Sequence, residues 1–195
     1  MQEENIDQPD IDRIVADLIL GAGDTTTLTM EWVLYLVSKN KEVQQKLRQN
    51  DETYLRNVLR ETLRLYPVVP FLNRILPNNA IISGYNIPAG TTMFLTIYTS
   101  GRDPKYFKNP EQFLPDRWLR DNTHSTVILQ KASLPFAVGV RSCVGKKIAE
   151  TQVMTTLSKI VNKFYVELCN VREIKIDLQM ISKPSEELRL KFHKI

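Results

Sequence analysis

The sequence has little of three residue types, and each scarcity excludes some chemistry: it contains 2 cysteines, 2 histidines and 7 glycines. Cys143 and Cys169 are too few for a disulfide framework, which fits a reducing compartment and leaves either sulfur free to bind a ligand. With only His124 and His193, a histidine-rich metal site or a histidine-based catalytic triad has little material. No apolar run is as long as the roughly 18 residues of a transmembrane helix. Residues 1–5 are too acidic and polar for a signal or transit peptide.

Charge is also modest. The formal net charge is +4, the pI is near 9.0, 43% of the residues are hydrophobic and 25% are charged. These proportions are ordinary for a globular protein, and they argue against a disordered chain. The small basic excess permits acidic partners but is too diffuse for nucleic acid, so we expect no nucleic-acid partner. A chain of 195 residues is long enough to bury a core of its own.

One cysteine stands in a loop that glycines punctuate, in residues 136–145. Helical periodicity begins just after Cys143, and the amides and dipole of a helix N-terminus stabilise a negatively charged atom. Gly139 lets the backbone turn or approach a flat ligand, and Arg141 supplies a permanent cation. The pattern indicates a thiolate ligand site. The alternative is that Cys143 is a small buried hydrophobic residue, which is the usual role of a lone cysteine.

Hydrophobic periodicity predicts a long helix over residues 10–39, with Asp10 as its N-cap. Its second half is apolar nearly all round, which is typical of a central, buried helix. Residues 21–27 are mostly poor helix formers, since they combine two glycines with three threonines. A conflict between local propensity and the flanking pattern is expected at functional sites.

The rest of the chain predicts shorter elements. We expect helices at residues 42–48, 52–66 and 145–163, a hairpin at 81–87, strands at 91–97, 164–166 and 188–192, and a proline-rich meander at 103–118. Pro67 and Pro70 end the second of these helices. The expected fold is therefore mainly α, with small β elements.

The pattern F-x-x-G-x-R-x-C-x-G, which runs from Phe136 to Gly145, resembles the haem loop of the cytochromes P-450, the haem-thiolate monooxygenases. The resemblance implies haem b as cofactor, with the Cys143 thiolate as the axial iron ligand. It assigns Phe136, Gly139 and Arg141 to cofactor binding, and it adds Arg74 as a second cation for the haem propionates. It also implies that residues 1–195 form the C-terminal part of a single P-450 domain whose N-terminal half is absent.

Two further motifs support the resemblance. Glu61 and Arg64 stand three residues apart on one predicted helix, where a carboxylate and a guanidinium can pair. Taken alone, such a pair is more often a solvated surface contact. The family motif E-x-x-R instead implies a buried triad, completed by Arg117 of residues 113–118. These three residues would be structural and would support haem incorporation.

Asp24 and Thr25 align with the acid and alcohol pair of the family. The resemblance implies that the Thr25 hydroxyl holds dioxygen and water, and that Asp24 feeds protons from solvent. Ala22 stands where many members carry glycine, which would slightly narrow the dioxygen groove. The alternative is a threonine-rich helix kink with an exposed aspartate.

Basic residues predict the electron donor. Arg56, Arg60, Lys146 and Lys147 fall where mitochondrial P-450s carry residues that dock an acidic ferredoxin. The resemblance therefore implies a mitochondrial enzyme on the matrix side of the inner membrane, close to the arthropod ecdysteroid hydroxylases, with a lipophilic, steroid-like substrate. Two alternatives stay open: a microsomal P-450 of the endoplasmic reticulum that uses a flavoprotein reductase, and an inactive truncated fragment. Any membrane association is expected through the missing half.

Overall fold

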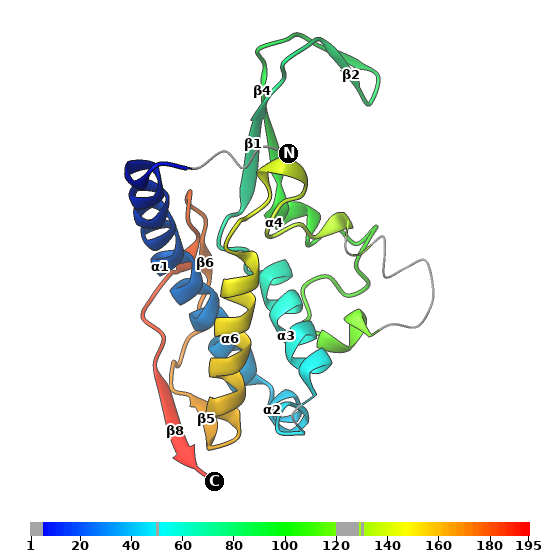
Figure 1. Ribbon diagram of the computed structural model, residues 1–195. Helices are drawn as coiled ribbons and strands as arrows, with labels where there is room; N and C mark the ends of the chain where they lie inside the picture. Colours follow the sequence, from blue (N-terminus) through cyan, green and yellow to red (C-terminus); the bar gives the residue numbers. More distant parts are fainter. Residues whose placement is uncertain (1–5, 50, 120–128, 130) are drawn as a thin grey trace.

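A computed structural model describes residues 6–49, 51–119, 129 and 131–195 (Figure 1). Helices dominate, which confirms the mainly α fold class. They are α1 (Gln8–Lys39), α2 (Lys41–Leu47), α3 (Glu52–Leu65), α4 (Ile97–Ser100) and α6 (Lys146–Val161), with two 3₁₀ turns, η1 (Pro115–Trp118) and η2 (Gly139–Arg141). His124 lies outside the described residues.

Within the described residues, the strands form four small antiparallel pairs. They are β1 (Phe71–Ile75) with β4 (Thr92–Thr96), β2 (Ala80–Ile82) with β3 (Tyr85–Ile87), β5 (Phe164–Leu168) with β8 (Leu190–Lys194), and β6 (Ile176–Asp177) with β7 (Lys183–Pro184). The predicted hairpin is confirmed. Its tip is Ser83-Gly84, and both residues have positive φ, 51° and 85°, as a tight two-residue hairpin turn requires.

Helix α1 begins earlier than predicted and is not broken in its middle. Its N-cap is Asp7, not Asp10, because the Asp7 carboxylate accepts a hydrogen bond of 3.1 Å from the Asp10 amide. Proline is tolerated in a first helical turn, so Pro9 does not delay the helix. Further on, the Thr25 hydroxyl donates to the Gly21 carbonyl at 2.9 Å, which keeps this polar group bonded within the helix.

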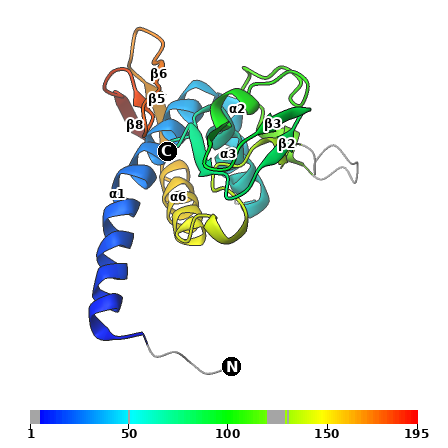
Figure 2. The ribbon, with the colours of Figure 1, turned by 90° about the horizontal axis from the view of Figure 1, so that it is seen from above.

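The core lies where α1, α3 and α6 pack side by side (Figures 1 and 2). Val37, Val58 and Leu157 of these helices are fully buried. The buried residues of α1 lie in its second half, where the apolar pattern predicted a central helix. Its first half extends from the body in Figure 2 and exposes apolar side chains, such as Ile19 at 69%.

Aromatic rings fill the space on the other side of α1. Trp32 stacks on Tyr66 with ring centroids 4.1 Å apart, and Tyr35 meets both rings edge-on. Burial raises the pKa of Tyr66 to about 12, so this hydroxyl is neutral at physiological pH. The cluster fixes the segment after α3 against α1.

Among the described residues, no helix has both the length and the apolar character to cross a membrane.

Candidate haem-thiolate site

A cavity of about 420 Å³ lies between α1, α3, α6 and the loop before α6. Its walls are mostly apolar, and the helices contribute Leu18, Leu59, Leu63, Ile148 and Val153, while the segment after α3 adds Val68, Val69 and Leu72. An apolar cavity with few polar groups suits a small lipophilic ligand.

Cys143 stands in the cavity wall, at the end of the loop that leads into α6. Its backbone amide donates to the Phe136 carbonyl at 2.8 Å, which closes the loop. This bond fixes the backbone position from which the Cys143 side chain extends. The side chain is exposed, and Phe136 lines the cavity beside it. Cys143 is therefore not a buried core residue, and the alternative role drawn from the sequence is wrong.

The loop before Cys143 has a backbone that only certain residues adopt easily. Gly139 has φ +77°, and a Cβ placed on it would meet no described atom within 4 Å. The backbone is therefore open on this side, so a flat ligand could lie against it without a side-chain clash. Arg141 lines the cavity two residues before the cysteine. The residues present thus offer a sulfur, an open backbone face and a cation to one ligand.

Thr25 and Asp24 are neighbours in sequence, but they face different surroundings. Thr25 lines the cavity, whereas Asp24 is exposed and is not among the described lining residues. Adjacent residues on a helix point about 100° apart, so Asp24 can face solvent while Thr25 faces the cavity. The Thr25 hydroxyl donates to the Gly21 carbonyl, and this leaves its oxygen able to accept a hydrogen bond.

Arg74 is not brought to the cavity. It lies in β1 with an exposed side chain, and its guanidinium donates to the Asn73 carbonyl at 2.6 Å. It is also absent from the described lining residues. Its assignment to a haem propionate stays a prediction.

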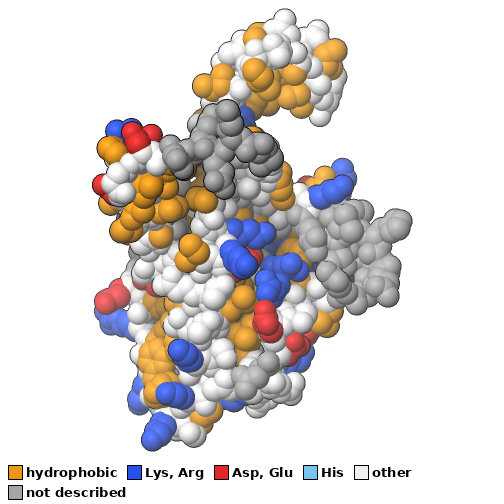
Figure 3. All heavy atoms as spheres, in the orientation of Figure 1, with side chains coloured by type: hydrophobic (Ala, Val, Ile, Leu, Met, Phe, Trp, Pro, Cys, Tyr) orange, Lys and Arg blue, Asp and Glu red, His pale blue; other side chains and the backbone are white. Residues whose placement is uncertain are grey.

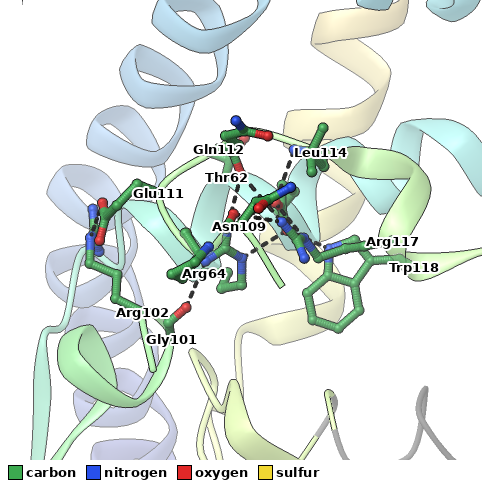
Figure 4. Close-up of polar contacts among 12 residues, drawn as sticks. Thr62, Arg64, Gly101, Arg102, Asn109, Glu111, Gln112, Leu114, Arg117 and Trp118 are labelled. Carbon is green, nitrogen blue, oxygen red and sulfur yellow. Dashed lines mark hydrogen bonds and ion pairs between the residues drawn. The ribbon is translucent and has the colours of Figure 1, made fainter. Parts of the chain in front are cut away.

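Glu61, Arg64 and Arg117 meet in one buried network (Figure 4). The Glu61 carboxylate accepts from Arg64 Nε at 2.9 Å and Nη2 at 2.8 Å, and from Arg117 Nε at 2.8 Å. The side chains of Glu61 and Arg64 are both 0% exposed. A solvated surface pair is therefore excluded by the burial of these groups. Arg64 also donates to the carbonyls of Gly101, Pro110 and Gln112, so it holds the meander against α3.

Trp118 is a member of this network that sequence reasoning missed. Its indole N–H donates to Glu61 Oε2 at 2.9 Å, and the Leu114 amide donates to Oε1 at 3.0 Å. The available signal was the tryptophan directly after Arg117, since a buried indole N–H usually finds an acceptor. Figure 4 shows Trp118 beside Arg117, at the end of the meander that η1 closes.

The predicted docking residues lie on α3 and at the start of α6, which pack together. Lys146 and Lys147 are exposed in the first turn of α6, and Arg60 is half-buried. Arg56 forms ion pairs with Glu52 at 2.9 Å and Glu150 at 3.7 Å, so part of its charge is compensated. Figure 3 shows basic side chains gathered over the region of α3 and α6.

In the described part of the chain, no three His, Cys, Asp or Glu side chains lie close enough together to hold a metal ion. These residues therefore offer no site for a metal bound by protein ligands alone. A single cysteine sulfur beside a cavity instead suits a metal whose other ligands come with an organic cofactor.

Comparison with known proteins agrees with a site that combines one cysteine sulfur with an organic cofactor. Residues 1–192 match the sequence model of the family described as Cytochrome P450. The relatives include Cytochrome P450 315a1, mitochondrial, of Drosophila melanogaster, which is 39% identical over 92% of this chain and 35% of the relative. Cholesterol side-chain cleavage enzyme, mitochondrial, of Hypanus americanus is 36% identical over 94% and 38%. Sterol 26-hydroxylase, mitochondrial, of Rattus norvegicus is 38% identical over 90% and 37%.

The chain therefore belongs to the cytochrome P450 family, whose cofactor is a haem with a thiolate ligand. It spans somewhat more than a third of the length of these curated relatives. The described residues fit such a group, because Cys143, whose side chain is exposed, and Arg141 border one apolar cavity. Gly139 leaves the backbone of the same loop without a side chain.

Proposed function

We propose that this chain forms the haem-binding and oxygen-activating part of a monooxygenase that inserts one oxygen atom from O2 into a lipophilic, steroid-like substrate. The observation that carries the proposal is one apolar cavity that has Cys143 in one wall and Thr25 in another. A ligand between them would have a sulfur donor on one side and a hydroxyl on the other. The names of the relatives, which include a sterol hydroxylase, support the steroid-like class.

Each residue has a distinct role in this proposal. The Cys143 sulfur would hold the iron of haem b, Phe136 and the open backbone at Gly139 would face the ring, and Arg141 would bind a propionate. Arg74 would bind the second propionate. This role requires β1 to bring the Arg74 side chain to the cavity, which it does not line in the structure. A thiolate-bound haem supplies the oxygen chemistry, because the sulfur pushes electron density that favours O–O cleavage.

Thr25 Oγ1 would accept a hydrogen bond from a water molecule in the cavity, and that water would deliver the proton toward the reacting oxygen. The Thr25 hydroxyl proton is donated to the Gly21 carbonyl, which leaves the oxygen of this lining residue as the acceptor. Asp24 is on the exposed side, where it can exchange protons with solvent. The adjacent residues Asp24 and Thr25 would then link solvent to the cavity across the width of α1.

Thr25→Ala is expected to uncouple electron use from product formation in the full-length gene product. Without the hydroxyl, protons reach the reacting oxygen poorly, so product per electron should fall about tenfold or more while hydrogen peroxide accumulates. Haem content should stay near normal. Thr27→Ala is the matched control, because Thr27 is on the same helix but is not among the described lining residues. Equal coupling in the two variants would contradict the relay.

We infer that the protein acts in mitochondria, on the matrix side of the inner membrane, and takes electrons from a ferredoxin. The names of the three relatives all carry the word mitochondrial, which supports this location. Lys146 and Lys147, together with Arg56 and Arg60, would form the docking surface for the acidic donor. A flavoprotein reductase also carries acidic docking residues, so a basic surface does not distinguish the two electron donors. The donor is identified by offering each one to the enzyme separately.

Reversing Lys146 and Lys147 to glutamate is expected to raise the donor concentration needed for half-maximal reduction about tenfold or more at low salt. The haem spectrum should be unchanged, and wild-type reduction should slow as salt rises, because exposed charges are screened over about 8–10 Å. Lys191→Glu with Lys194→Glu is the control, since it makes the same charge change on β8. Each donor is offered separately with a steroid probe; turnover with the reductase alone would overturn the ferredoxin assignment.

A further inference from the structure

Two lysines begin α6, at a place where a helix usually carries the opposite charge. Lys146 and Lys147 directly follow the N-cap residue Gly145, and the first turn of the helix contains no acidic residue. The N-terminus of a helix carries a partial positive charge, so a cation is unfavourable there. A departure from a local preference is expected where the function of the protein requires it.

The two lysines are neighbours in sequence, but their ammonium groups have different surroundings. The Lys146 Nζ atom lies over the Phe136 ring, 5.6 Å from the ring centroid. A cation within about 6 Å of an aromatic centroid is attracted to the face of the ring. Lys147 instead borders an open groove on α6, beside Thr151. Within the described residues, Lys146 is therefore the lysine of this pair that an aromatic ring holds in place.

Phe136 connects Lys146 to the thiolate loop. The Phe136 carbonyl accepts a hydrogen bond of 2.8 Å from the Cys143 amide, and the Phe136 side chain lines the same cavity as Cys143. The ring is partly buried and packs against the core cluster of α1, α3 and α6. Because the core restrains the ring, the ring can hold the flexible lysine side chain at the cavity wall that contains Cys143.

We propose that Lys146, held by the Phe136 ring, stabilises the reduced state of the haem-thiolate site, whereas Lys147 serves donor docking alone. This inference rests on the proposed function, because it requires a haem at Cys143. Reduction adds one negative charge to the site, and a cation held nearby stabilises that charge. Without the ring, the Lys146 side chain would extend into solvent, where water and salt screen its charge.

Lys146→Gln tests this role in the full-length gene product. The substitution removes the charge and keeps a flexible polar side chain. At the potential that half-reduces the wild-type haem, the ratio of reduced to oxidised haem should fall about threefold, because one stabilising charge is lost. Chemical mediators set the potential, so donor docking does not affect the measurement. Lys146→Arg should restore the wild-type ratio, since a guanidinium also binds the face of a ring.

Lys147→Gln is the matched control, because it removes the same charge from the adjacent residue. It should leave the ratio of reduced to oxidised haem unchanged. Phe136→Leu provides a second control through a double-mutant cycle. In the Phe136→Leu background, Lys146→Gln should have no further effect on the ratio, because the ring that holds the ammonium is gone.

Three results would overturn the proposal. An unchanged ratio in Lys146→Gln would show that this charge does not act on the haem site. Equal changes in Lys146→Gln and Lys147→Gln would assign the effect to net charge alone. A full effect of Lys146→Gln in the Phe136→Leu background would remove the role of the ring. Absence of a thiolate-haem band in the wild-type protein would instead refute the proposed function, so the two failures are distinguishable.

Discussion

Cys143→Ser is expected to abolish the reduced carbon monoxide band of a thiolate haem in the full-length gene product. The sulfur of Cys143 is the group in the cavity wall that can donate as a thiolate, and the loop bond from its amide to Phe136 holds it there. A serine hydroxyl is smaller and far less acidic, so it would not replace the electron push of the sulfur. The measurement is the difference spectrum after reduction and exposure to carbon monoxide.

Cys169→Ser is the matched control for this prediction. Cys169 is also an exposed free cysteine, but it lies after β5 and is not among the described residues of the cavity. Its replacement should leave the band unchanged, which would show that loss of a thiol as such has no effect. An unchanged band in the Cys143 variant would refute the assignment of the ligand.

Much of the fold could be predicted because its signals are local. The periodicity of residues 52–66 and the stop at Pro67 correspond to α3, which ends at Leu65. The hairpin followed from the Ser83-Gly84 pair between apolar residues. In such segments the local residue preferences determine the backbone conformation, and no distant contact opposes them.

The prediction failed where side chains outside the simple pattern decided the result. The start of α1 depends on a carboxylate three residues before Asp10, which the hydrophobic period does not reveal. The continuous helix through residues 21–27 was predicted correctly, although its threonines are poor helix formers in isolation. Thr25 returns its hydroxyl proton to the Gly21 carbonyl one turn earlier. The low helix propensity of residues 21–27 is therefore evident in the sequence, but the backbone of these residues is helical.

The site was predictable as a set of residues but not as an arrangement. The sequence placed Cys143 and Thr25 in motifs, and the fold brings both to one cavity. It could not tell that Arg74 lies on an exposed strand and outside the described lining of the cavity. Trp118 was overlooked because no motif assigned it a role, whereas the motif assigned one to Arg117, which is equally distant from Glu61 in sequence. Contacts at that separation depend on how the meander packs on α3.

Glu61→Ala is expected to prevent accumulation of haem-loaded protein. Glu61 accepts five hydrogen bonds from described groups of Arg64, Leu114, Arg117 and Trp118. Its loss leaves two guanidinium groups without their anion, and the Arg64 side chain is 0% exposed. Removing one partner of a buried ion pair costs about 3–5 kcal/mol of unfolding free energy, which is a large share of the stability of a typical domain. The measurements are the haem-to-protein ratio and urea denaturation of the full-length gene product.

Glu52→Ala provides the control on the same helix. Glu52 also pairs with an arginine one turn away, Arg56, at 2.9 Å, but its side chain is 77% exposed. Solvent and salt screen such a pair, so its loss should change the unfolding free energy by about 1 kcal/mol or less and leave haem loading intact. The two variants remove the same chemical group at similar ion-pair distances and differ mainly in burial. Similar losses in both would mean that the Glu61 network stabilises the protein no more than a surface contact does.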